Sequence, residues 1–158
     1  MSMGSIDLGE WMGSLAQAAD DIARGALGWP GCRVSQEPCV PAPICGAYVP
    51  LIDGNASMQI ALLSDDEGCH MLARALLGLA PGEPPLPSAD VADAVGEIAN
   101  MLAGGLKRRM QGRIGSLALG LPIFIRGRVE ATDKLEMARA RVQLGPVVAL
   151  VMVLRHRV

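Results

Sequence analysis

Aromatic side chains are scarce in this chain of 158 residues, which has two Trp, one Tyr and one Phe, 3% in total. Proteins that bind single-stranded nucleic acid stack its bases on aromatic rings, and this chain has few such rings. The formal net charge is only −2, without the excess of Lys and Arg that is typical of a general nucleic-acid binder. We therefore expect no nucleic-acid partner.

Long hydrophobic runs are also missing. The longest apolar stretch lies near Pro146 to Leu154 and is about half as long as a membrane-spanning helix requires. The N-terminus carries Asp7 and Glu10 and has no basic start followed by an apolar segment, so it does not resemble a secretory signal. The sequence predicts no membrane contact and a cytoplasmic location.

Metal and nucleophile motifs are absent from the pattern of cysteines and histidines. Cys32, Cys39, Cys45 and Cys69 show no paired Cys-x-x-Cys spacing, so reduced and mostly buried thiols are expected. Cys69 and His70 are adjacent on a predicted helix and point about 100° apart, so they cannot easily share one ion. With two histidines in unrelated segments, no Ser/His or Cys/His constellation can be built, and no Walker loop or dinucleotide fingerprint is found. We expect no metal ion or cofactor bound by this chain itself.

Hydrophobic residues make up 51% of the chain, enough for one packed core, and the length favours a single domain over residues 1–158. Helical spacing from Ile6 to Leu27, followed by Gly28 and Pro30, predicts a first amphipathic helix. The proline-rich stretch 31–43 is interpreted as a loop or an irregular edge strand. Segments 44–50 and 56–63 flank Asp53-Gly54-Asn55, which predicts a hairpin of two antiparallel strands.

The second half of the chain is predicted to contain two further helices and three strands. Ser64 to Glu67 offers an N-cap for a helix that ends near Gly78, and the prolines of 81–87 form a stiff connector. Ser88 is expected to cap a third helix that continues to about Gln111. Strand-like segments follow, the last two joined by a turn at Gly145-Pro146: 116–127, 136–144 and 147–155. The pattern predicts an α+β fold in which a mostly antiparallel sheet of about five to six strands packs with three helices.

The third predicted helix carries a polar stripe. At 100° per residue, Asp93, Glu97 and Asn100 fall within about 60°, and apolar residues gather on the other side of the helix: Val91, Val95, Ile98 and Leu102. On spacing alone, the stripe is equally well explained as solvated surface. Asn in mid-helix is locally unfavourable, however, and Gly104 and Gly105 each cost about 1 kcal/mol relative to Ala. Such costs favour a surface that another group approaches closely.

A basic cluster follows the stripe, at Lys107, Arg108, Arg109 and Arg113. We interpret it as a solvated helix end whose charge complements the helix dipole, rather than as a nucleic-acid site.

The spacing Asp93-x-x-x-Glu97-x-x-Asn100, followed by Met101-Leu-Ala-Gly104 and later by Leu121-Pro122, resembles the signature of the CheX, CheC and FliY family of chemotaxis response-regulator phosphatases. The resemblance is closest to the single-site CheX type and extends to the order of the predicted elements. It implies a CheX/CheC-like fold.

The resemblance also implies a function, hydrolysis of the phosphoaspartate on a CheY-like receiver domain. Glu97 would pair with the receiver's lysine and anchor docking, and Asn100 would orient the attacking water. Asp93 would support the helix surface or contact the partner, and Gly104 would contact the partner by leaving space for the receiver's loops. Any Mg²⁺ would be held by the receiver. A homodimer through sheet edges is implied too, with support from the apolar strand 147–154, which would be a liability as an exposed edge. The alternative is a non-catalytic receiver-binding or adaptor module that uses the same helix.

Overall fold

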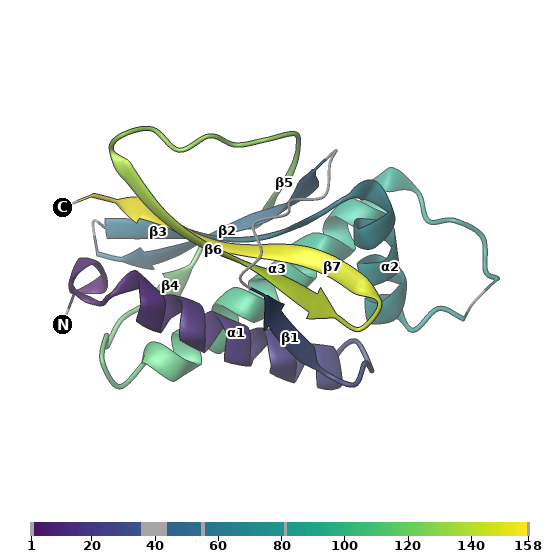
Figure 1. Ribbon diagram of the computed structural model, residues 1–158, viewed down its shortest axis with the longest axis horizontal. Coiled ribbons are helices and arrows are strands. Elements are labelled where there is room, and N and C mark those ends of the chain that lie inside the picture. The colour runs from purple at the N-terminus through teal and green to yellow at the C-terminus, as the bar shows by residue number, and fades with distance from the viewer. Residues whose placement is uncertain (1, 36–43, 55, 81, 158) are drawn as a thin grey trace.

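One antiparallel sheet with helices packed on one of its faces forms the protein (Figure 1). The computed structural model describes residues 2–35, 44–54, 56–80 and 82–157. Its elements are η1 (Met3–Ser5), α1 (Leu8–Arg24), β1 (Cys32–Ser35), β2 (Cys45–Asp53), β3 (Ala56–Ser64), α2 (Asp66–Leu77), α3 (Ser88–Met110), β4 (Ala118–Leu119), β5 (Ile123–Arg126), β6 (Leu135–Leu144) and β7 (Val147–His156).

The α+β class with three α-helices is confirmed, and the sheet has seven strands rather than five or six. The strand order is β1-β6-β7-β3-β2-β4, and β5 also pairs with β2, along residues 45–48, whereas β4 pairs with residues 51 and 52. The predicted single strand over 116–127 is wrong, because it breaks into β4 and β5 around Gly120 and Pro122. The proline-rich stretch does supply an edge strand at 32–35, while Cys39 and the rest of 36–43 lie outside the described residues.

Strand β7 lies in the interior of the sheet, between β3 and β6. Val151 and Val153 face the main core beneath the helices, whereas Leu150 and Met152 join a smaller apolar cluster on the opposite face. A strand buried on both faces has a nearly continuous apolar sequence. Strand 147–154 is therefore not an edge that a second copy would have to cover, and its apolar character does not argue for a dimer.

Helix boundaries follow local capping chemistry, with one correction at the start of α3. Within the predicted capping stretch 64–67, the side chain of Asp65 caps α2 by accepting a hydrogen bond from the N–H of Gly68 at 2.7 Å. Ser64 instead donates its hydroxyl to the Val148 carbonyl at 2.8 Å. At α3 the N-cap position falls on Pro87, so Ser88 is the first helical residue and provides no side-chain cap. Gly78 ends α2 in the left-handed conformation, as its position predicts.

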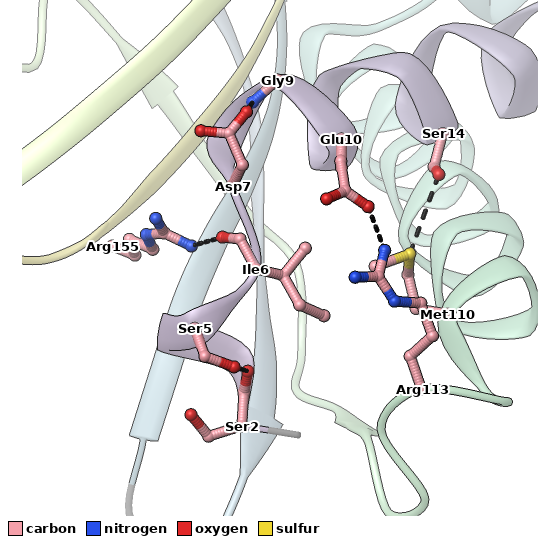
Figure 2. Close-up of polar contacts among 10 residues, drawn as sticks. All are labelled: Ser2, Ser5, Ile6, Asp7, Gly9, Glu10, Ser14, Met110, Arg113 and Arg155. Carbon is pink, nitrogen blue, oxygen red and sulfur yellow. Dashed lines mark hydrogen bonds and ion pairs between the residues drawn. The ribbon is translucent and has the colours of Figure 1, made fainter.

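The N-terminal region is held by contacts from distant parts of the chain, several of which Figure 2 shows. Arg155, 9% exposed, donates to the carbonyl of Ile6, and Glu10 forms an ion pair with Arg113. Arg109 likewise pairs with Asp21. The basic cluster after the stripe is therefore not only solvated surface, since two of its arginines join α3 and the following turn to α1.

Candidate functional site

Helix α3 presents the polar stripe at the surface of the protein. Its buried side chains pack into the main core: Val91, Ala94, Val95, Ile98, Ala99, Leu102, Ala103 and Leu106. Asp93 and Glu97 are exposed and Asn100 is half-buried. The structure thus brings the three predicted polar residues onto one outward-facing surface of the helix, and Gly104, half-buried, follows one turn after Asn100.

The side chains of Asp93, Glu97 and Asn100 form no hydrogen bond or ion pair with any other residue that the structure describes. A carboxylate accepts hydrogen bonds and attracts cations, whereas a primary amide both donates and accepts. Glu97 and Asn100 therefore offer two different polar groups to a partner, and no internal bond has to be broken first.

A short segment between β4 and β5 runs beside the stripe. A Cβ atom placed on Gly96 would lie 3.5 Å from the Cβ and Cγ atoms of Pro122, and one on Gly104 would lie 3.9 Å from a methyl carbon of Leu119. Gly96, Asn100 and Gly104 are spaced by four residues and so share one row of the helix surface. Asn100 lies on this row between the two glycines that the segment flanks.

This bordering segment is fixed to β2. Gly120 donates its N–H to the carbonyl of Pro50 at 2.8 Å, and the strands on either side pair with β2. A Cβ atom on Gly120 would lie 2.2 Å from Cγ of Pro50, so a side chain there requires the segment or β2 to shift. Because Pro122 also lacks an N–H, the segment cannot continue the strand ladder and instead packs against α3.

One large apolar side chain next to this segment's contact with α3 is strongly exposed: Leu121, at 84%. Leu121 precedes Pro122, which contacts α3 at Gly96. Ile123 is also exposed, at 61%, but it pairs with Tyr48 and so points to the face of the sheet opposite α3. An exposed apolar side chain near unpartnered polar groups is typical of an interaction surface. The sequence interpretation missed the contribution of Gly96, although the Gly-Leu-Pro interruption of a strand pattern was a usable signal.

The two adjacent glycines of α3 have different surroundings. A Cβ atom on Gly105 would lie 3.0 Å from the Cβ of Ala18 in α1, and Gly105 is buried. Gly104 faces the surface, with the Arg108 guanidinium 3.7 Å from such a Cβ. Close helix packing therefore explains Gly105, and Gly104 is the glycine that borders the stripe.

Elsewhere, the described cysteines are free, and two of them are neighbours in the core. The Sγ atoms of Cys45 and Cys69 are 3.5 Å apart, and burial raises the pKa of both thiols. The described part of the chain contains no group of three or more His, Cys, Asp or Glu residues that could hold a metal ion. Within the same residues, no helix combines the length and the apolar character needed to cross a bilayer.

A family model described as "Chemotaxis phosphatase CheX" matches residues 47–143, more than half of the chain and the whole of α3. The protein belongs to the CheX family, as the resemblance of the stripe and of the element order predicts. No curated protein sequence matches this chain.

Solved structures show the same fold. A chemotaxis protein CheX from Vibrio vulnificus superimposes with a TM-score of 0.72 at 13% identity, covering 94% of this chain and 99% of that one. A CheX–CheY–BeF₃–Mg²⁺ complex from Borrelia burgdorferi gives 0.68 at 15% identity, covering 94% and 98%. FliY from Thermotoga maritima gives 0.61 at 14% identity, covering 92% and 86%.

Proposed function

We propose that this protein hydrolyses the phosphoaspartate of a CheY-like receiver domain, with α3 as the docking helix. The observation that carries the proposal is the unpartnered pair of Glu97 and Asn100 on the surface of α3. The exposed side chain of Leu121, next to Pro122, adds apolar contact area near this pair. Membership of the CheX family supports the same reaction.

The two side chains take different roles in this proposal. The Glu97 carboxylate pairs with a cationic side chain of the receiver, because a charge-assisted hydrogen bond gives both affinity and orientation. The neutral amide of Asn100 orients the attacking water without repelling the phosphoryl oxygens. Phosphoryl transfer depends mainly on positioning and on electrostatic stabilisation, so no general base from this chain is required. Asp93 and Gly104 contact the partner on either side of the pair.

Mg²⁺ belongs to the receiver in this scheme. The related Borrelia burgdorferi complex contains CheY together with BeF₃ and Mg²⁺. This chain is proposed to supply only side chains to a site that the receiver completes. A cytoplasmic location remains a prediction from the sequence.

The decay of a phosphorylated receiver, followed with and without this protein, tests the proposal. We expect wild type to accelerate the decay, Asn100→Ala to lose the rate at saturating concentration, and Glu97→Ala to require more protein for the half-maximal rate. Glu130→Ala is the matched control, because Glu130 is an exposed carboxylate between β5 and β6, away from α3. Full activity of Asn100→Ala would contradict the role of the amide.

The same experiment distinguishes the adaptor alternative. Calorimetry measures direct binding of the phosphorylated receiver alongside its decay. If the protein is an adaptor, it binds the receiver but does not accelerate the decay. Binding that depends on Glu97 while the decay rate stays that of the receiver alone would overturn the enzymatic proposal.

We further propose that residues 1–158 form one domain that associates as a homodimer through sheet edges. The strands at the two ends of the described sheet are β1 on one side and β4 with β5 on the other. Val34 in β1 is 45% exposed, so this edge offers apolar surface as well as backbone groups. Light scattering that gives the monomer mass at all concentrations would contradict the dimer.

A further inference from the structure

The face of the sheet opposite the main core carries its own apolar cluster, which includes Ile44, Tyr48, Leu63, Leu150 and Met152. Residues 127–134, which join β5 to β6, arch over this face, on the side away from α1 (Figure 1). We call residues 127–134 the strap. The strap has no regular secondary structure, so its backbone does not extend the sheet.

Two adjoining cavities lie between the strap and the sheet. The larger one has a volume of about 340 Å³, within the size range of small-molecule sites. The smaller one has a volume of about 180 Å³. Tyr48 of β2 and Val129 of the strap line both, so the cavities form neighbouring parts of one groove on this face.

Tyr48 introduces an unsatisfied polar group into this apolar surface. The side chain is 6% exposed, and its hydroxyl oxygen is closed off from solvent without a hydrogen-bond partner among the residues that the structure describes. Burial raises the pKa of the phenol, so the group stays protonated and remains a donor. A buried donor without an acceptor destabilises a protein, and an acceptor atom from a bound molecule would remove that cost.

The charges around the larger cavity favour an anion. Arg128 on the strap and Arg139 on β6 both line it, are exposed, and form no ion pair within the described part of the chain. Glu130 is the one acidic residue in the lining. Two guanidinium groups at the rim of an apolar cavity fit a molecule with an apolar body and one carboxylate end.

We propose that the groove under the strap binds a small amphipathic carboxylic acid. Its apolar body lies against Leu63, Leu150 and Met152, its carboxylate pairs with Arg128 and Arg139, and the Tyr48 hydroxyl donates to an oxygen of the same group. This site is separate from α3, which packs on the opposite face of the sheet. The proposal is therefore independent of the phosphatase function.

Calorimetric titration of the full-length protein with decanoate, below its micelle concentration, tests the proposal. We expect saturable binding with one site per chain, weakened roughly tenfold in Tyr48→Phe and in Arg139→Gln, because each change removes one hydrogen bond to a charged group. Arg33→Gln is the matched control, since Arg33 is an exposed arginine of β1 that does not line either cavity. Decyltrimethylammonium, with the same chain and the opposite charge, should bind at least tenfold more weakly.

Urea unfolding without ligand provides a second measurement. Tyr48→Phe should unfold at the same or a higher urea concentration than wild type, because the hydroxyl has no partner to lose. Unchanged decanoate affinity in Tyr48→Phe, equal binding of the cationic detergent, or no saturable binding would each overturn the proposal. So would light scattering that shows a dimer dissociated by Val129→Asp, because the groove would then be an interface between two copies.

Discussion

Gly105 of α3 lies directly against Ala18 of α1, where a Cβ atom on Gly105 would approach the Cβ of Ala18 to 3.0 Å. A Cβ atom on the adjacent Gly104 would meet nothing closer than 3.7 Å. Both glycines lie inside a helix, where glycine is unfavourable, but only Gly105 is required by the packing of α1 on α3.

This difference predicts opposite effects of substituting the two glycines. Gly104→Ala should raise the free energy of unfolding by up to about 1 kcal/mol, because alanine is the better helix former and the position has room. Gly105→Leu should lower it by about 1–3 kcal/mol, because the side chain must displace α1. Urea unfolding measures both variants, and shifts in the same direction would show that the two positions do not differ in packing.

Gly120→Ala should displace the segment that borders Asn100. The new methyl would lie 2.2 Å from Cγ of Pro50, and we expect a loss of about 1–3 kcal/mol in stability together with a slower phosphatase reaction. Replacing Pro50 by Ala removes the obstructing ring, so the double variant Gly120→Ala/Pro50→Ala should be more stable than the sum of the single changes predicts. Additive effects in this double-mutant cycle would show that contact with Pro50 is not the cause.

Leu121→Asp should weaken docking of the receiver without unfolding the protein. The side chain is 84% exposed, so the free energy of unfolding should change by no more than about 0.5 kcal/mol. The receiver concentration for the half-maximal decay rate should rise severalfold, because an apolar contact is replaced by a charge that must be desolvated. Leu77→Asp is the matched control, since Leu77 is 51% exposed at the end of α2, and equal effects of both variants would argue against a specific contact at Leu121.

Alkaline pH should destabilise the protein through its thiols. Burial raises the pKa of Cys32 from 9.0 to about 11, and burial also raises the pKa of Cys69. The unfolded chain therefore loses thiol protons first, and the free energy of unfolding should fall as the pH rises from about 9 toward 11, whereas below pH 9 these thiols contribute no pH dependence.

Urea midpoints measured between pH 7 and pH 10.5 check this dependence. Cys32→Ala should show a shallower decline than wild type over the same range. An identical decline in the variant would show that the Cys32 thiol is not a source of the effect.

Local patterns predicted most of the elements correctly. Helical spacing indicated α1, α2 and α3, and Gly78 ends α2 in the left-handed conformation as its position suggests. In the hairpin between β2 and β3, Gly54 has a φ of 57°. This left-handed conformation is easily adopted by glycine and is typical of hairpin turns. These features depend on residues within a few positions of each other, so they can be predicted from the sequence alone.

Apart from the N-cap of α3, which falls on Pro87 instead of Ser88, the errors involve residues that are distant in the sequence. The break between β4 and β5 depends on contact of Gly120 with Pro50, and the interior place of β7 depends on pairing with β3 and β6. Arg109, near the end of α3, forms an ion pair with Asp21 of α1. No local sequence pattern specifies this contact.

The sequence by itself determined that α3 has one apolar and one polar face, because the 3.6-residue period of a helix fixes which side chains share a face. It also determined that Asp93, Glu97 and Asn100 lie together. Only the tertiary structure decided that Pro122 packs beside them on α3, that Gly105 belongs to the α1 contact rather than to the polar surface, and that Tyr48 is buried on the far side of the sheet without a partner among the described residues. The physical reason is that burial and contact are set by which distant segments pack together, whereas helical periodicity is set within a few turns of the chain.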